Sequence, residues 1–458
     1  MRIIICGAGQ VGYGIAEKLA TENNDVTVID QSPRLVNAIR DTLDVRGFVG
    51  HGSHPDVLAR AGADEADMLI AVTFSDEVNM IACQVAHSLF SLPTKIARIR
   101  SQTYLAKHWS NLFSRDHLPI DVIISPEVEV GEMVLRRLAQ PGAVETIAFA
   151  DDKVTVLGIA CGEDCPVIDT PLRQLTELFP DLNATVVGIF RAGHLFVPRS
   201  ADQMMVGDLV YVMTDTGRVK RTLTIFGKED TLGSRVVIGG GGNIGHYVAH
   251  HLEERNSRAK IKVIEADRDR AVHIAEALDR TVVLHGSAMD EVILKEADIA
   301  DADTMIAVTN DDKVNILSCV MSKRLGCRRT LSLLNDPAFP PLVRSIGIDA
   351  FVDPRAVTIS RILQHVRRGR IRNVHTIQNG AAEVIEAEAL ETSPLVGRPL
   401  SELDLPKGIR IGAILHDGEV IVPGGASQIR KGDRLVIFAA ADQVHRVEQM
   451  ARVSLEYF

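Results

Sequence analysis

The sequence predicts an α/β protein with two Rossmann-like, doubly wound parallel-sheet domains, each followed by a small α+β domain. The first observation is a Gly-x-Gly-x-x-Gly loop that occurs twice, in "RIIICGAGQVGYGI" and in "RVVIGGGGNIGHYV". Each loop follows an apolar strand and precedes an apolar helix, which is the context that a dinucleotide-binding βαβ unit requires. The second observation is that the segments after the two loops align with few insertions, so the repeat predicts a duplicated pair of domains.

The length of 458 residues is compatible with four domains of roughly 100–200 residues or fewer. The aligned halves place their boundaries near residues 140, 230 and 375. The polar stretch "GKEDTLGSR" (227–235) is predicted to link the halves. The predicted domains are a first Rossmann-like domain at 1–140, a first small domain at 141–228, a second Rossmann-like domain at 233–373 and a second small domain at 374–458.

Short identities guide the alignment of the two Rossmann-like units. The strand "DVTVID" matches "IKVIEAD", which pairs Asp30 with Glu265. "AVTFSDEVN" matches "AVTNDDKVN". We also expect His51-Gly52-Ser53 to pair with His285-Gly286-Ser287, because the letters are identical.

The small domains share a second set of signals. Each begins with Pro-Leu and a segment with acidic and apolar residues, "PLRQLTELF" or "PLSELDLP", in which we expect a helix. Ala-Gly and Asp-Gly dipeptides between alternating apolar residues, in "GIFRAGHLFVP" and "GAILHDGEVIVP", predict β-hairpins. Asp208 and Asp433 each follow a glycine before a final strand.

Composition excludes several classes of protein. The net charge of -10 and the pI near 5.9 argue against non-specific nucleic-acid binding, which favours a basic surface. The chain opens directly in an apolar strand, and no apolar run approaches the roughly 20 residues of a membrane span. Cys161 and Cys165 lack the second pair that a zinc site needs. We therefore expect a reduced, cytosolic protein that does not span the membrane.

The glycines of the first loop each have a physical role. Gly7 allows a tight turn, Gly9 lets the backbone approach a pyrophosphate, and Gly12 lets the helix pack closely on the strand. The pyrophosphate then lies at the helix N-terminus, where free N–H groups favour negative charge. In the second loop the corresponding residues are Gly240, Gly242 and Gly245, preceded by Gly239.

An acid ends the second strand of each unit, Asp30 or Glu265. An acid at this position hydrogen-bonds a ribose hydroxyl and repels a 2′-phosphate, so it favours NAD over NADP and is compatible with the ribose of ATP. The alternative is a Rossmann-like fold with a degenerate site.

Further candidate contacts follow later strands. Ligands bind beyond the carboxyl ends of the strands in a doubly wound sheet, and the residues predicted there are Thr73, Phe74, Thr309 and Asn310. The alternative is an ordinary loop in which Ser75 or Asp76 caps the next helix. Arg98 could direct a cation at the nucleotide, and we place Ser332 at its position in the second half.

No repeated catalytic group accompanies the loops. A dehydrogenase needs a proton donor beside the nicotinamide, and the chain has no Tyr-x-x-x-Lys pair. His51, His54 and His285 are predicted in loops near the adenosine. His246 and His250 have helical spacing that suits a metal, but no HExxH pattern accompanies them, so we predict a solvated helix face. Two nucleotide sites without a chemical step suit ligand sensing.

The domain order and the motifs "MRIIICGAGQVG", "VTVID", "ADMLIAVTFSDEVNMIACQVA", "IISPE", "VVIGGGGNIG" and "IKVIEAD" resemble the TrkA family over essentially the whole chain. These proteins are the peripheral NAD-binding regulatory subunits of bacterial Trk potassium uptake systems, built from tandem RCK, or KTN, domains. The resemblance implies a cytoplasmic protein on the inner face of the cell membrane. It also implies a homo-oligomer, with tetramers forming a ring, bound to a membrane-embedded potassium-translocating subunit. The implied ligands are NAD or NADH, and ATP or ADP.

The resemblance also implies site residues. The first site would use Gly7, Ala8, Gly9, Gln10, Val11, Asp30, Thr73, Phe74 and Arg98, and the second Gly239, Gly240, Gly241, Gly242, Asn243, Glu265, Thr309 and Asn310. No metal ligand and no catalytic residue is implied. Four consecutive glycines are expected to make the second loop more flexible, and a histidine-glycine-serine triplet replaces the Gly-Asp after the third strand of many relatives.

Two other hypotheses remain open from the sequence. One is an NAD-dependent oxidoreductase with an unrecognised substrate site. The other is a structural scaffold with vestigial nucleotide sites.

Overall fold

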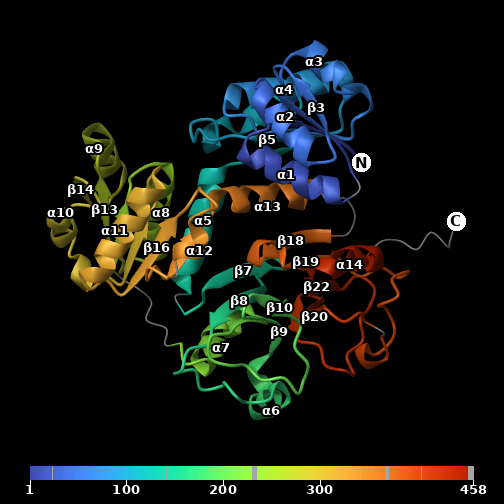
Figure 1. Ribbon diagram of the computed structural model, residues 1–458, viewed down its shortest axis with the longest axis vertical. Helices are drawn as coiled ribbons and strands as arrows, with labels where there is room; N and C mark the ends of the chain where they lie inside the picture. The colour runs from blue at the N-terminus through green and yellow to red at the C-terminus, as the bar shows by residue number, and fades with distance from the viewer. Residues whose placement is uncertain are drawn as a thin grey trace. The chain divides into compact units, whose positions relative to one another are not determined.

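The structure is a computed structural model that describes residues 1–22, 24–140, 142–228, 235–343, 345–366, 371–403 and 405–451. It forms two compact units (Figure 1). One unit contains residues 1–134 and 234–366, and the other contains 135–233 and 367–458. Most of the linker predicted at 227–235 lies outside the described residues. The four domain boundaries stay predictions, whereas the predicted fold class is confirmed by the sheets described below.

The first Rossmann domain has a six-stranded parallel sheet in the order β3-β2-β1-β4-β5-β6. The order reverses between β1 and β4, which is where doubly wound sheets bind ligands. Its elements are β1 (Arg2–Cys6), α1 (Gln10–Thr21), β2 (Asp25–Asp30), α2 (Pro33–Thr42), β3 (Arg46–Val49), α3 (Pro55–Arg60), β4 (Met68–Ala71), α4 (Asp76–Phe90), β5 (Thr94–Arg98), a 3₁₀ segment (Lys107–Phe113), β6 (Val122–Ile124) and α5 (Pro126–Ala139).

Central strands are apolar on both faces because helices cover both. Ile3, Ile4 and Ile5 are almost completely buried, and they divide between two apolar clusters on opposite faces of the sheet. The helices begin where the sequence supplies caps: the Ser75 hydroxyl accepts a hydrogen bond from the backbone N–H of Val78 at the start of α4.

The second Rossmann domain repeats this topology in the order β14-β13-β12-β15-β16-β17. All of its recorded strand pairs are parallel. Its elements are β12 (Arg235–Gly239), α8 (Asn243–Arg255), β13 (Lys260–Glu265), α9 (Arg268–Ala277), β14 (Val282–His285), α10 (Glu291–Glu296), β15 (Thr304–Ala307), α11 (Asp312–Arg324), β16 (Arg329–Leu333), α12 (Pro340–Val343), β17 (Ala350–Val352) and α13 (Pro354–Val366).

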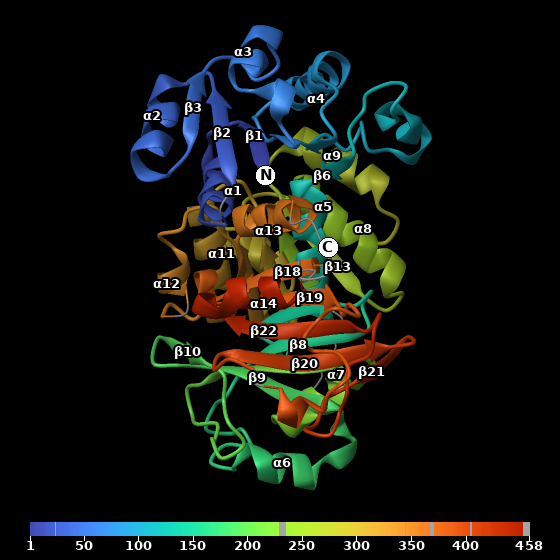
Figure 2. The ribbon, with the colours of Figure 1, turned by 90° about the vertical axis from the view of Figure 1, so that its right-hand side faces the viewer.

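The two Rossmann domains exchange their last helices within one compact unit. Helix α13 packs against α1, and α5 against α8 (Figure 2). Each crossing joins a glycine to a large side chain. A Cβ atom at Gly14 of α1 would lie 2.4 Å from Ile359 of α13, and one at Gly131 of α5 would lie 2.3 Å from Tyr247 of α8. Both crossings are therefore close helix contacts. The glycine lies on α1 in one crossing, and in the other it lies on the exchanged helix, α5.

The second compact unit contains the two small domains, each with a five-stranded antiparallel sheet of the same topology. The orders are β10-β9-β11-β8-β7 and β18-β19-β22-β20-β21. The first contains β7 (Glu145–Phe149), β8 (Val154–Ala160), α6 (Leu172–Leu178), β9 (Ala184–Arg191), β10 (His194–Phe196), β11 (Leu209–Asp215) and α7 (Val219–Ile225). The second contains β18 (Ile371–Ile377), β19 (Ala382–Glu388), β20 (Ile409–His416), β21 (Glu419–Ile421), β22 (Arg434–Ala440) and α14 (Val444–Ala451).

The two small domains share an apolar core. Phe149, Tyr211 and Phe438 are completely or almost completely buried in one cluster drawn from both sheets. A Cβ atom at Gly188 of β9 would lie 2.4 Å from the ring of Phe438, so this glycine makes room for the ring.

The hairpin predictions are confirmed. Ala192 and Gly193 have φ angles of 50° and 83°, and Asp417 and Gly418 have 46° and 87°, as tight turns between twisted strands require. The helix predicted after the second Pro-Leu is wrong, because Leu400–Glu402 forms only a 3₁₀ turn. The following Pro406 disfavours helical backbone at the residue before it, so the segment cannot extend as α6 does.

Candidate functional site

Both glycine loops have the geometry that close strand-to-helix packing requires. Gly7 and Gly240 have φ angles of +115° and +104°, which favour glycine. A Cβ atom at Gly12 would lie 1.8 Å from the carbonyl oxygen of Gly7, and one at Gly245 would lie 1.9 Å from that of Gly240. The backbone of each helix therefore lies directly against its own loop.

The middle glycines of the two loops face open space. A Cβ atom at Gly9 or Gly242 would meet no protein atom within 4 Å. These residues are the N-caps of α1 and α8, and no side chain caps either helix. Each helix therefore presents uncapped backbone N–H groups to an open cradle, which is the arrangement that binds a phosphate group.

The acids at the ends of β2 and β13 hold the loops in place. Asp30 accepts hydrogen bonds from the backbone N–H groups of Ala8 (2.8 Å) and Ser32 (2.8 Å). Glu265 accepts them from Gly241 (2.6 Å) and Asp267 (2.9 Å). The predicted pairing of Asp30 with Glu265 is confirmed by these matching bonds.

The longer acid of the second half explains one of its four glycines. Glu265 reaches the loop with one more methylene than Asp30, so its carboxylate lies where a loop side chain would stand. A Cβ atom at Gly241 would lie 2.3 Å from Ile274 and 2.9 Å from the carboxylate oxygen Oε2 of Glu265. The first half combines the shorter Asp30 with Ala8 at the same position. A side chain at position 241 would therefore have to displace the ends of the Ile274 and Glu265 side chains.

Backbone hydrogen bonds after β3 and β14 correct the predicted alignment. The backbone N–H of Gly50 donates to the carbonyl oxygen of Asp30, and that of Gly286 donates to the carbonyl oxygen of Glu265, so Gly286 corresponds to Gly50. The predicted pairing of His51-Gly52-Ser53 with His285-Gly286-Ser287 is therefore wrong by two residues. The strand register decides this, because Val49 lies opposite Asp30 and His285 lies opposite Glu265.

The corrected alignment places Gly52 opposite Ala288. A Cβ atom at Gly52 would lie 2.9 Å from the Cβ of Cys6, and one at Gly239 would lie 3.0 Å from the Cβ of Ala288. Each half has room for one side chain at this contact. In the first half the strand residue Cys6 supplies it, and in the second half the loop residue Ala288 does.

Thr73 and Thr309 are each held by a buried asparagine. The backbone N–H and the hydroxyl of Thr73 both donate to Oδ1 of Asn79, at 2.9 and 2.7 Å. Asn79 in turn donates to the carbonyl oxygen of Arg98 at 2.9 Å. Thr309 makes the same two bonds with Asn315, and both asparagines are 0% exposed. Asn79 and Asn315 therefore link the ends of two neighbouring strands.

Arg98 lies at the first site, where its Nη2 donates to the carbonyl oxygen of Thr73 at 2.9 Å. Burial, with the nearby charge of Arg100, lowers the pKa of Arg98. The predicted match of Arg98 with Ser332 is wrong by one residue. Ser332 corresponds to Ala97 and is fully buried, whereas Leu333 occupies the position of Arg98. The second site still lacks this cation.

A cavity of about 1810 Å³ within this unit brings most of the predicted residues together. Phe74 and Asn310 are exposed at its margin, and Ser75 and Asp311 cap the following helices. Ala8, Gly12, Gly239 and Gly241 do not line the cavity. The predicted residues that line it are Gly7, Gly9, Gln10, Val11, Asp30, Thr73, Phe74, Arg98, Gly240, Gly242, Asn243, Glu265, Thr309 and Asn310.

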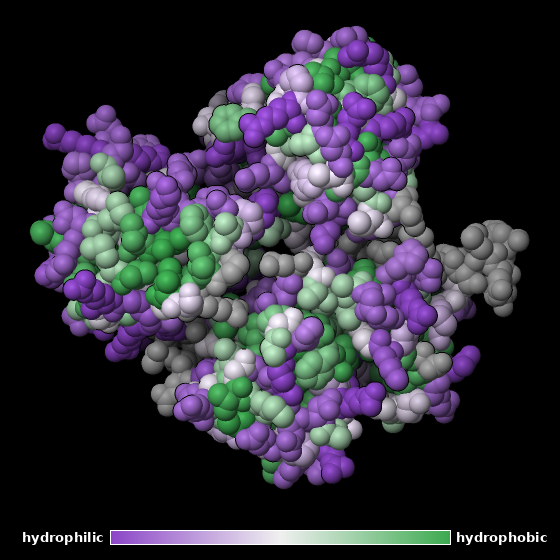
Figure 3. Space-filling view, in the orientation of Figure 1, coloured by the Kyte–Doolittle hydropathy of each residue, from purple (hydrophilic) through white to green (hydrophobic). Residues whose placement is uncertain are grey.

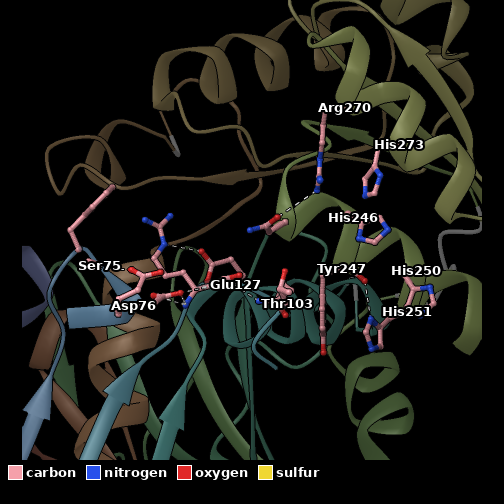
Figure 4. A pocket seen from close by; sticks show the side chains of 16 residues that line it. Ser75, Asp76, Thr103, Glu127, His246, Tyr247, His250, His251, Arg270 and His273 are labelled. Carbon is pink, nitrogen blue, oxygen red and sulfur yellow. Dashed lines mark hydrogen bonds and ion pairs between the residues drawn. The ribbon is translucent and has the colours of Figure 1, made fainter. Parts of the chain in front are cut away.

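The prediction of a solvated face at His246 and His250 needs a correction. His250 is exposed, but His246 is half-buried, and both line a second cavity of about 830 Å³ beside the second loop (Figure 4). Among the residues that the structure describes, no group of three or more His, Cys, Asp or Glu side chains is arranged to hold a metal ion.

The sequence reasoning missed three residues. Asn79 and Asn315 position the threonines, and their recurrence within two apolar helices was the available signal. Arg270 on α9 donates its Nε to the carbonyl oxygen of Gly241 at 2.9 Å. Its equivalent in the first half is Leu35, so no repeated letter marked it.

Comparisons with known proteins agree with this duplicated architecture. The TrkA-N domain family matches residues 3–126 and 236–354, and the TrkA-C domain family matches 156–227 and 384–452. The Trk system potassium uptake protein TrkA of Azorhizobium caulinodans is 60% identical over 458 residues, covering 100% of both chains. The protein of the same description from Halomonas elongata is 40% identical over 462 residues, again covering 100% of both chains.

Solved structures show the same fold at low identity. A GsuK channel is 17% identical, with a TM-score of 0.62 over 98% of this chain and 78% of that chain. A GsuK channel bound to NAD has a TM-score of 0.60, also at 17% identity, over 98% of this chain and 78% of that chain. The tandem domain matches and the full-length relatives show that the chain belongs to the family of Trk system potassium uptake proteins TrkA.

Proposed function

We propose that this chain is a nucleotide-sensing cytosolic regulatory subunit that gates a membrane potassium uptake transporter. The observation that carries the proposal is the pair of open cradles at Gly9 and Gly242, each at an uncapped helix N-terminus beside an acid. Relatives that are 60% and 40% identical over full length are named Trk system potassium uptake proteins, which supports the transport role.

The proposed ligands are NAD or NADH, and ATP or ADP. Uncapped N–H groups of α1 and α8 would bind the phosphates, and Asp30 and Glu265 would accept hydrogen bonds from ribose hydroxyls. Those of the remaining predicted residues that line the cavity would contact the rest of the nucleotide. A structurally similar GsuK channel is described as bound to NAD, which supports a nucleotide at this fold.

A ligand in the cavity would contact the helices that the two Rossmann domains exchange. The cavity lining includes Pro126 and Glu127 at the start of α5, and Pro354 and Arg355 at the start of α13. These are the two helices that the Rossmann domains exchange. A ligand that contacts them would favour one arrangement of the domains over another, which is the differential interaction that gating requires.

The proposed partner is the membrane-embedded potassium-translocating subunit, with the chain bound as a homo-oligomer, a tetramer forming a ring, on the inner face of the membrane. Among the described residues, no helix is both long and apolar enough to cross a bilayer. Apolar side chains gather on the second Rossmann domain (Figure 3), and exposed ones there include Val292, Leu317 and Leu342. Such patches often mark protein contacts, which supports an oligomer.

Potassium flux into proteoliposomes that contain the cognate membrane subunit tests the proposal. The purified chain should change the flux, and NADH or ATP should alter that change. Calorimetry on the chain alone should show nucleotide binding. A chain that binds no nucleotide, or whose effect on flux ignores bound nucleotide, contradicts the proposal. NADH consumption with a panel of carbonyl substrates tests the oxidoreductase alternative, and no turnover is expected.

A further inference from the structure

The second glycine loop has three basic side chains at its outer edge, which we call the basic rim: His246, Arg270 and His273. Arg270 donates Nε to the carbonyl oxygen of Gly241 at 2.9 Å, and its Nη2 lies 3.5 Å from Oδ1 of Asn243. Figure 4 shows the three rim side chains one beyond the other along one wall of the smaller cavity, with Arg270 and His273 from α9 and His246 from α8. Arg270 lines both this cavity and the larger one that contains the proposed phosphate cradle, whereas His246 and His273 line the smaller cavity beside it.

The first loop has no such rim. Matching hydrogen bonds at the helix N-termini align α1 with α8 and α2 with α9. The rim positions are occupied in the first half by Tyr13, Leu35 and Ala38, none of which is a cation at neutral pH. The two sites therefore share the cradle and the acid, and differ in charge at the edge.

The charge of the rim is not neutralised by the protein. No carboxylate of the described residues forms an ion pair with Arg270 in the structure. The Nε2 atom of His246 is buried and has no hydrogen-bond partner. Burial lowers the pKa of His246, and electrostatic repulsion, chiefly from Arg270, lowers it further, against an opposing effect of Glu253. The rim is a repulsive cluster that an anion would stabilise.

The charged groups on the facing wall are already engaged. Asp76 accepts hydrogen bonds from the backbone N–H groups of Arg100 and Ser101. Glu127 forms an ion pair with Arg100 at 3.1 Å, although its second carboxylate oxygen has no partner. Glu77, which is exposed, accepts a hydrogen bond from the hydroxyl of Ser75. The remaining titratable groups that line the cavity are Tyr247, His250 and His251 of α8.

We propose that the basic rim makes the second loop select a nucleoside triphosphate over a dinucleotide. This inference rests on the proposed function, because it assumes that the cradle binds a pyrophosphate. A triphosphate carries additional charge beyond the pyrophosphate, and Arg270 offers charge-assisted hydrogen bonds to it. NADPH also carries an additional phosphate, but Glu265 lies beside the ribose and repels a 2′-phosphate. The first loop lacks the rim, and its own cation, Arg98, already donates to the carbonyl oxygen of Thr73, so we expect a weaker preference for a triphosphate there.

His246 adds a dependence on pH. It lines the same smaller cavity as Arg270, so an anion held at Arg270 stabilises the protonated form of His246, and binding of a triphosphate takes up protons. By linkage, the affinity of the second site for ATP rises as the pH falls from 8 to 6. The first site should not show this change.

A reciprocal exchange between the two halves tests the selection. Calorimetry on the full chain measures ATP, NADH and NADPH in three variants: Arg270→Leu, Arg270→Lys and Leu35→Arg. Arg270→Leu should lower the ATP-to-NADH affinity ratio at one site by about tenfold or more, and Arg270→Lys by less. Leu35→Arg should raise the ratio at the other site. For the two Arg270 variants a Gly9→Ala background leaves the second site to be measured, and for Leu35→Arg a Gly242→Ala background leaves the first.

The outcomes separate this inference from the proposed function. If no nucleotide binds at either loop, both fail. If nucleotides bind but Arg270→Leu and Leu35→Arg leave the ratio unchanged, the rim has no selective role and the proposed function stands. Tighter binding of NADPH than of ATP at the second site also overturns the inference.

Proton uptake provides a second readout. The wild-type chain should take up protons when ATP binds at pH 7, which calorimetry in buffers of different ionisation enthalpy measures. The variant His246→Gln should take up fewer protons and lose most of the gain in affinity at pH 6. Equal proton uptake in the two proteins overturns the role of His246.

Discussion

Two alanine substitutions in the first loop should separate binding from stability. At Gly9 the added methyl meets no protein atom within 4 Å, and the backbone angles of -67° and -176° suit any residue. Loss of chain freedom in the unfolded state stabilises Gly9→Ala by up to about 1 kcal/mol. Alanine is a poorer N-cap than glycine by a similar amount, so the net change should stay within about 1 kcal/mol.

At Gly12 the same methyl would lie 1.8 Å from the carbonyl oxygen of Gly7, so backbone must move by more than about 1 Å. Overpacking of this kind costs about 3 kcal/mol or more, and a domain of this size loses roughly 2–4 °C per kcal/mol. We therefore expect Gly12→Ala to lower the midpoint of thermal unfolding by about 6 °C or more.

The binding assay completes the comparison. The methyl of Gly9→Ala occupies the path of a pyrophosphate, so the first site should lose at least about tenfold in affinity for NADH in calorimetry. Gly242→Ala is the matched change in the second loop and should affect only the other site. The reasoning is refuted if Gly9→Ala binds NADH as the wild type does, or destabilises the chain as much as Gly12→Ala.

Three further changes test the structure elsewhere. Asn79→Ala should destabilise the chain by about 2–4 kcal/mol in denaturant unfolding, because buried backbone groups lose their partners; an unchanged unfolding midpoint would contradict that role. Burial by itself raises the pKa of Glu145, but the hydrogen bond and charge of His375 outweigh it and lower the pKa below the usual 4.5. The ionised Glu145 therefore contributes to stability above pH 4.5, and this contribution is lost as the pH falls through the lowered pKa. Glu145→Gln should flatten the acid limb of a curve of unfolding free energy against pH. Arg191→Ala should cost about 2–4 kcal/mol, because it leaves Asp208, whose side chain is 1% exposed, without its ion-pair partner; equal unfolding midpoints would show that the pair contributes nothing.

Much of the fold was readable because it depends on local patterns. Apolar runs of strand length, glycine loops and hairpin dipeptides specify their conformation through nearby atoms, and duplication showed each pattern twice. The pairing of Asp30 with Glu265 followed in the same way, since both end the strand after a glycine loop. The helix predicted in "PLSELDLP" (399–406) failed because the apolar pattern was given more weight than the proline that ends the segment.

The errors in alignment have a different origin. Identical letters suggested that Gly286 corresponds to Gly52, and a short match suggested Ser332 for Arg98. The strand register instead pairs Gly286 with Gly50 and Leu333 with Arg98. A shift of one residue turns a side chain to the other face of a sheet, and only hydrogen bonds between strands distant in sequence determine that shift.

The sequence by itself determined the fold class, the duplication and the two glycine loops, because these follow from backbone freedom at glycine and from apolar periodicity. Only the tertiary structure showed which substitutions between the halves compensate one another. The first half combines the shorter acid Asp30 with Ala8, and the second combines the longer acid Glu265 with Gly241. It alone brought Arg270 beside the second loop, since that contact joins a helix to a carbonyl oxygen on another element. Contacts of this kind depend on packing in three dimensions. A residue that differs between the two halves forms no repeated pattern, so the sequence does not predict its contact.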